Sequence, residues 1–169
     1  MDKIIIEPGH GVGVLKLGLT KNNVNECIQT FIQQYNDHEN RHFENYVIPG
    51  YNENEKMIAV QVVRDLMKYA NFECHGIDVF NTKAEKLVKY MDKISPYLRN
   101  WESAAGGHYV FPDIGLALYR SNAITEEDLK EEWFLAQSLE NQEYDMKYLF
   151  FESIMVCGLN YYDFLRIGE

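Results

Sequence analysis

The stretch Gly11–Phe31 constrains the fold of this chain most, because it has the pattern of a short strand followed at once by a capped helix. Apolar residues form its first part, and Gly18-Leu19 supplies a corner before Thr20. The Thr20 hydroxyl can accept a hydrogen bond from the free amides of a first helical turn. The sequence therefore predicts a helix from Lys21 to Asp37, with apolar residues at helical spacing: Val24, Cys27, Ile28 and Phe31.

Two later threonines indicate two more helix starts. Thr82 and Glu85 have the spacing of a capping box, and the helix behind them should end before Pro96. Thr125 precedes three acidic residues and should start a third helix that buries Trp133. We expect each of the three threonine hydroxyls to accept a hydrogen bond from an amide two or three residues further on.

Alternation and β-branched runs predict several strands, four of which would pair as hairpins through the turns Pro49–Asn52 and Pro112-Asp113. Met57–Arg64 is favoured as a strand, with a helix as the alternative, and so is the apolar run Met146–Val156. The other expected strands are Lys3–Ile6 at a sheet edge, Arg41–Ile48, Asn71–Val79, Tyr109–Phe111 and Ile114–Tyr119.

The order capped helix then hairpin occurs twice, once after Thr20 and once after Thr82. Two helix-plus-hairpin units that share an antiparallel sheet, with helices on one face and a third capped helix, give an α+β fold. A chain of 169 residues has the length of a single domain, so we expect one domain over residues 1–169.

The charge balance narrows the classes of partner that this chain can bind. Twenty-six acidic residues against sixteen basic ones give a net charge of −10, which argues against nucleic acid and anionic membranes.

Cys27, Cys74 and Cys157 are widely spaced and form no Cys-x-x-Cys pair, which favours a reducing compartment. No apolar run reaches the ~18 residues of a membrane span, and the N-terminal apolar run is short for a secretory signal. The sequence predicts a soluble, cytoplasmic protein.

The glycine-rich segment with Gly9, Gly11 and Gly13 is the first candidate for a cofactor motif. A phosphate-binding loop needs its glycines between a strand and a helix, whereas these precede a strand, so we expect a turn or bulge and no cofactor. Neither Ser103 nor Ser153 lies in a Gly-x-Ser-x-Gly elbow. The sequence therefore predicts no catalytic residues.

Two histidine–carboxylate pairs give the alternative hypothesis of a metal-dependent enzyme. His42 and Glu44 are two residues apart, as are Glu73 and His75, and on strands each pair would share a face. Neighbouring strands would bring all four side chains onto one divalent metal ion. Recognised metal sites have tighter ligand spacing, so we expect no metal and two solvent-facing polar pairs.

The strongest functional signal is an acidic stretch. Between Asn122 and Asp145, eight acidic residues stand against Lys130 alone, a net charge of −7. Three of the acids begin the expected third helix, where the helix dipole favours anions. The other five form either a solvated helix face or a surface for a basic protein partner, and they are our predicted partner-binding residues: Glu131, Glu132, Glu140, Glu143 and Asp145.

Two short segments resemble known protein families. Leu17–Val24 resembles the strand–Gly–Thr–helix opening of β-lactamase-inhibitor-like and outer-membrane-assembly lipoprotein domains, which are binding modules. Phe111–Ser121 and the closing Asn160–Leu165 are similar to small bacterial cytoplasmic proteins that include suspected toxin-immunity proteins. The chain lacks the lipobox cysteine and paired cysteines of the first group. The resemblance thus implies a non-catalytic protein-binding module, with toxin neutralisation as its candidate role.

Overall fold

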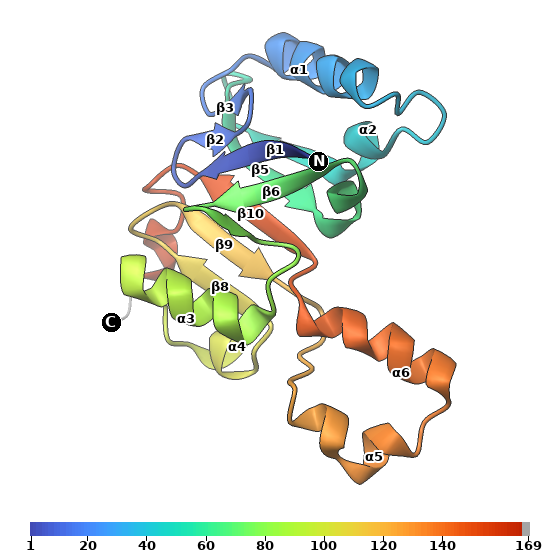
Figure 1. Cartoon of the computed structure of the whole chain (residues 1–169). Coiled ribbons are helices and arrows are strands. Elements are labelled where there is room, and N and C mark those ends of the chain that lie inside the picture. The colour runs from blue at the N-terminus through green and yellow to red at the C-terminus, as the bar shows by residue number, and fades with distance from the viewer. Residues whose placement is uncertain (167–169) are drawn as a thin grey trace.

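The computed structural model describes residues 1–166 and shows an α+β fold in which the strands of this range form two five-stranded sheets (Figure 1). The strands are β1 (Asp2–Glu7), β2 (Gly11–Val12), β3 (Leu15–Lys16), β4 (Val47–Tyr51), β5 (Met57–Val63), β6 (Ala70–Cys74), β7 (Ile77–Asp78), β8 (His108–Phe111), β9 (Leu116–Tyr119) and β10 (Ser153–Cys157). The α-helices are α1 (Lys21–Gln34), α2 (His42–Tyr46), α3 (Ala84–Ile94), α4 (Trp101–Ala104), α5 (Glu132–Leu135) and α6 (Leu139–Met146). Four 3-10 helices complete this part of the chain: η1 (Arg64–Lys68), η2 (Asp128–Lys130), η3 (Lys147–Leu149) and η4 (Asp163–Leu165).

One sheet contains more residues than the other, and we call it the larger sheet. It has the order β4-β5-β10-β9-β8 and is antiparallel throughout. Both predicted hairpins belong to it, β4–β5 on one side of β10 and β8–β9 on the other. Each hairpin follows a helix, α1 or α3, so the prediction of two helix-plus-hairpin units on a shared antiparallel sheet is confirmed.

The smaller sheet, with the order β3-β2-β1-β6-β7, was not predicted. Its β1 pairs in parallel with β6 and antiparallel with β2, so β1 is an internal strand and not the expected edge strand. The glycine-rich segment forms turns on both sides of β2, where Gly9 (φ +72°) and Gly13 (φ +56°) adopt the left-handed conformation that glycine tolerates best. The expected turn before a strand is therefore present.

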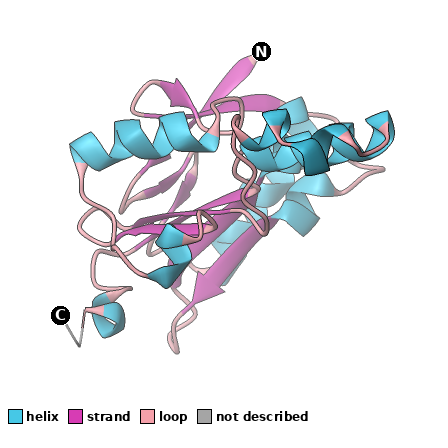
Figure 2. Ribbon diagram, turned by 90° about the horizontal axis from the view of Figure 1, so that it is seen from below, coloured by secondary structure: helices cyan, strands magenta, loops and turns pink. Residues whose placement is uncertain are grey.

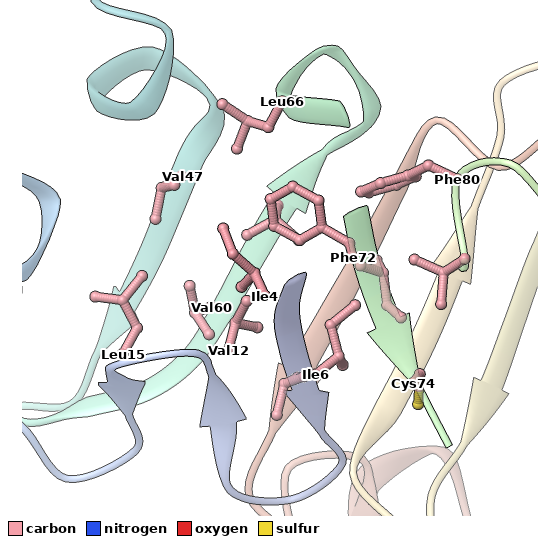
Figure 3. Close-up of a cluster of buried hydrophobic side chains, with 14 of the residues drawn as sticks. Ile4, Ile6, Val12, Leu15, Val47, Val60, Leu66, Phe72, Cys74 and Phe80 are labelled. Atoms are coloured by element: carbon pink, nitrogen blue, oxygen red, sulfur yellow. The ribbon is translucent and has the colours of Figure 1, made fainter. Parts of the chain in front are cut away.

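The core lies between the two sheets. Side chains of the smaller sheet, such as Ile4 and Phe72, and of the larger sheet, such as Val60, belong to one buried cluster (Figure 3). The apolar faces of α1 and α3 join this cluster, and Figure 2 shows helices on both sides of the strands. Each fully buried large apolar side chain contributes roughly 1.5–3 kcal/mol, so this shared core stabilises both sheets together.

Helix starts agree with the prediction at α1 and differ at α3. The Thr20 hydroxyl accepts a hydrogen bond from the amide of Asn23 at 3.2 Å, so the predicted cap is confirmed. At α3 the capping position is Lys83, and no side chain caps it, so the prediction for Thr82 is wrong. The turn before α3 is ordered by the Asp78 carboxylate instead, which accepts from the amides of Phe80 and Asn81. The helix ends before Pro96, as expected.

The predicted strand Arg41–Ile48 is wrong over most of its length, because residues 42–46 form α2 and β4 begins only at Val47. The buried Asp37 carboxylate accepts from the amide of Phe43 at 2.8 Å and so stabilises the first turn of α2. Pro49 lies within the edge strand β4, where the missing amide costs no ladder hydrogen bond. The hairpin turns later, where the Asn52 side chain accepts from the amides of Asn54 and Lys56.

Candidate functional site

The connection between β9 and β10 is a long helical excursion, residues 121–152, which we call the acidic arm. Figure 1 shows its helices α5 and α6, in orange, standing away from the two sheets. The strands that it joins are antiparallel neighbours, which a two-residue turn would connect. The arm is therefore not needed to close the sheet.

A single buried side chain fixes both ends of the arm to the sheet. Arg120 is only 3% exposed and donates to the carbonyl oxygens of Ile124 (3.1 Å) and Tyr148 (2.6 Å), one in each stem of the arm. A third bond reaches the carbonyl of Gly106 at 2.8 Å, and the guanidinium lies 5.6 Å from the Phe151 ring. Burial lowers the pKa of Arg120 from its usual range, and these carbonyl oxygens compensate for the lost water.

The predicted third helix breaks into two pieces. The Thr125 hydroxyl accepts from the Asp128 amide at 3.3 Å, so the predicted capping bond is confirmed. Only the short η2 follows, and Glu131 adopts an extended conformation (ψ 147°) before α5 begins. This break changes the helical phase, so that Phe134 is buried and Trp133 is 48% exposed. The prediction that Trp133 packs inward is wrong.

Helix α6 contributes no buried residue, although it contains large apolar side chains. Leu139 is 78% exposed and Tyr144 is 58% exposed, and Met146 on the same helix is also exposed. Ser138 caps the helix by accepting from the amide of Asn141 at 3.3 Å. The helix is therefore well formed. The Tyr144 ring contacts the Tyr148 ring and the Lys147 ammonium, while Leu139 and Met146 stay outside the buried core.

The five predicted partner-binding acids all lie on the arm. Glu131, Glu132, Glu140 and Glu143 are exposed, while Asp145 is half-buried and accepts from Gln137 at 3.1 Å. Glu132 and Glu140 occupy the first turns of α5 and α6, where the helix dipole favours a carboxylate. These two acids thus have a local stabilising role that the sequence analysis did not assign to them.

Sequence reasoning missed the apolar part of this surface. Around the four exposed glutamates the arm exposes five large apolar side chains: Trp133, Leu135, Leu139, Tyr144 and Met146. The available signal was the spacing of these residues, which do not recur every three or four positions along α6 as a buried stripe would. The arm combines negative charge with exposed apolar and aromatic groups, which suits it chemically to bind a protein.

The four residues of the metal hypothesis do not come together. His42 and Glu44 lie in the short helix α2 and not on a strand, and Glu44 pairs with Arg41. Glu73, on β6, pairs with Lys3 at 2.9 Å, and His75 occupies the turn after β6. Within residues 1–166 no group of three or more histidine, cysteine or carboxylate side chains is arranged to hold a metal ion.

His42 belongs instead to a hydrogen-bonded cluster around Asp37. Its Nδ1 lies 3.1 Å from the Asp37 carboxylate, and its Nε2 lies 2.6 Å from the Lys68 ammonium. The Tyr69 hydroxyl donates to the same carboxylate at 2.5 Å. Since the Lys68 ammonium can only donate, Nε2 accepts and Nδ1–H faces Asp37. Both imidazole nitrogens are therefore engaged, and the cluster holds the loop between α1 and α2 in place.

Comparison with known proteins gives no relative for this chain, since no family model, curated protein or solved structure matches it. Among the described residues, no helix has both the length and the apolar character required to cross a bilayer. The arm therefore has to be interpreted from its own chemistry.

Proposed function

We propose that this chain is a non-catalytic protein-binding module that docks a basic protein partner on the acidic arm. The observation that carries this proposal is α6, a capped helix that buries none of its residues and exposes Leu139, Tyr144 and Met146 beside two glutamates. Exposed apolar groups gathered in one place are characteristic of interaction surfaces.

Polar hydrogen bonds and a few buried side chains give the arm its shape, so Leu139 and Met146 are not needed for it. Gln142 donates to the carbonyl oxygen of Gln137 at 3.1 Å, and Gln137 donates to Asp145, so polar bonds connect α6 to the turn before it. The buried apolar side chains of the arm are Ile124, Phe134, Leu149 and Phe151. A helix of eight residues is marginal when isolated, so these contacts preorganise α6 before any partner binds.

Charge defines the kind of partner. The arm carries most of the net negative charge of the chain, −7 of −10 between Asn122 and Asp145. Such a surface attracts a positively charged protein over distances of about a Debye length and raises the rate of encounter. Apolar contacts at Leu139 and Tyr144 then hold the complex together.

Toxin neutralisation is the specific role that we propose within this class. The resemblance of Phe111–Ser121 to suspected immunity proteins supports it, and this segment includes β9 and leads directly into the arm. A toxin that acts on nucleic acid has a basic surface, which an acidic arm would cover. The cytoplasm is the compartment that this role requires.

Affinity capture from the native cell tests the proposal. The bait is the parent chain, compared with a Leu139→Ser/Tyr144→Ser variant and with a matched control, Ile5→Ser/Ile94→Ser, which removes exposed apolar side chains elsewhere. We expect a basic protein to elute with the parent and the control and to be lost from the arm variant. Equal recovery of the same proteins by all three baits would contradict the proposal, because it would mean that the arm is only a solvated surface.

A further inference from the structure

A second candidate site lies outside the arm. A cleft of about 840 Å³ opens between the β2–β3 hairpin, the β4–β5 turn and the segment that follows β10. Leu17 and Ile58 supply apolar surface, Tyr161 and Phe164 supply aromatic rings, and Lys56 supplies an ammonium group. Small-molecule sites commonly enclose ~300–1,000 Å³ and combine apolar walls with a few polar groups.

Backbone hydrogen bonds to β5 hold the walls of the cleft. The amide of Gly18 donates to the carbonyl oxygen of Met57 at 2.7 Å, and the amide of Gly158 donates to that of Ile58 at 3.2 Å. A methyl group added at Gly18 would meet no atom within 4 Å, so the space beside this residue is open. The cleft is therefore preformed at the place where three separate segments meet.

The charge of the cleft differs from that of the molecule. The chain has ten more acidic than basic residues, yet none of the described residues that line the cleft is acidic. Within residues 1–166 the Lys56 ammonium has no carboxylate within ion-pair distance; the ion pairs of this range involve other side chains. An unpaired ammonium beside apolar surface favours an anionic group on a ligand.

We infer that this cleft binds a small organic anion with an aromatic or branched apolar body. The anionic group would contact Lys56, and the apolar body would cover Leu17 and Ile58 beside the rings of Tyr161 and Phe164. This inference is independent of the arm, because no residue of the arm lines the cleft.

A matched pair of fluorescent probes tests the inference. Anilinonaphthalene sulfonate carries an anionic group, and phenylnaphthylamine is its neutral analogue. Titrations use the parent chain, Lys56→Met, and the control Lys89→Met, which removes an exposed lysine of α3. We expect Lys56→Met to weaken sulfonate binding roughly tenfold, while its affinity for the neutral probe and both affinities of the control stay unchanged.

A second variant locates the probe. Ile58 is partly exposed, so Ile58→Glu should fold and should remove binding of both probes by placing a carboxylate on the apolar surface. The arm variant Leu139→Ser/Tyr144→Ser should bind both probes like the parent. Absence of sulfonate binding by the parent, equal affinity in Lys56→Met and Lys89→Met, or loss of binding in the arm variant would each overturn the inference.

Discussion

At the scale of single residues, Asp37 is the side chain with the most demanding environment. Its carboxylate is fully buried, a position that ordinarily favours the neutral acid. Burial acts to raise the pKa of Asp37, but hydrogen bonds from Tyr69, the Phe43 amide and His42 outweigh it and lower the pKa below its usual value. The charged carboxylate is thus the form that holds the α1–α2 loop.

Stability should therefore depend on Asp37 and on pH. Because the folded-state pKa lies below the unfolded value of ~3.9, the contribution of Asp37 is fully present above that value and is lost as the pH falls through the folded-state pKa. We expect Asp37→Asn to lower the free energy of unfolding by about 2–4 kcal/mol at neutral pH, and by less in acid. Urea unfolding of both proteins at several pH values measures this, and a difference that grows toward acid pH would contradict it.

Two threonines with similar sequence settings give a second prediction at this scale. Thr20 caps α1 through the Asn23 amide, whereas Thr82 precedes the uncapped start of α3. Thr20→Ala should cost ~1 kcal/mol of unfolding free energy, and Thr82→Ala should cost clearly less. Thermal and urea denaturation of the two variants provide the comparison. Equal losses would mean that the capping bond at Thr20 has no net stabilising effect.

At the scale of elements, the acidic arm depends on Arg120 for its position. This guanidinium is the link between the carbonyl oxygens of the two stems, at Ile124 and Tyr148. We expect Arg120→Met to keep both sheets and to loosen the arm, because the two carbonyls lose their donor and the sheet pairing does not involve them.

Amide hydrogen exchange separates these effects. Protection should fall at least tenfold in residues 122–149 of Arg120→Met and remain near the parent value in β5 and β10, a local loss of about 1.4 kcal/mol or more. Lys89→Met, which removes an exposed cation of α3 outside the arm, is the matched control and should leave the arm protected. Uniform loss of protection in the sheets would show that Arg120 supports the whole fold.

The elements that sequence reasoning found are those with a clear periodic signal. Helices α1 and α3 and both hairpins of the larger sheet follow from apolar spacing and from turn chemistry. Helix α2 was missed because the Asp37 carboxylate, which lies before the helix and matches no common capping pattern, stabilises its start, while local alternation favoured a strand. The smaller sheet was missed because the pairing of β1 with β6 joins segments more than sixty residues apart, which no local pattern records.

The acidic residues of the candidate site were predicted from the sequence, but its exposed apolar residues were not. The residue type gives the charge of a side chain directly, so the five acids of the arm could be named without a structure. Exposure of Leu139 and Tyr144 could not, because an apolar residue in a helix is buried by default and only the tertiary placement of α6 leaves it in solvent. The phase change at Glu131 likewise decides that Phe134 and not Trp133 is buried.

At the scale of the whole molecule, the two sheets share one core, and the two proposed binding surfaces lie outside it. The arm is acidic, apolar in part and set apart from the sheets, whereas the cleft beside β5 has no acidic lining residue among those described. The proposed protein partner and the proposed small anion would therefore bind without competing. This separation also makes the arm the natural target of electrostatic tests, because exposed charges contribute little to stability.

The measurement that tests the central claim most directly is the association rate of the captured partner at low and high salt. The test variant is Glu131→Lys/Glu132→Lys on the arm, and the control is Glu26→Lys/Glu39→Lys, which changes the net charge equally at exposed positions outside the arm. We predict that salt slows association of the parent and that the arm variant associates roughly tenfold more slowly at low salt with a weaker salt dependence, while the control stays close to the parent. An arm variant that associates as fast as the parent, with the same salt dependence, would contradict the proposal that the acidic arm receives a basic protein.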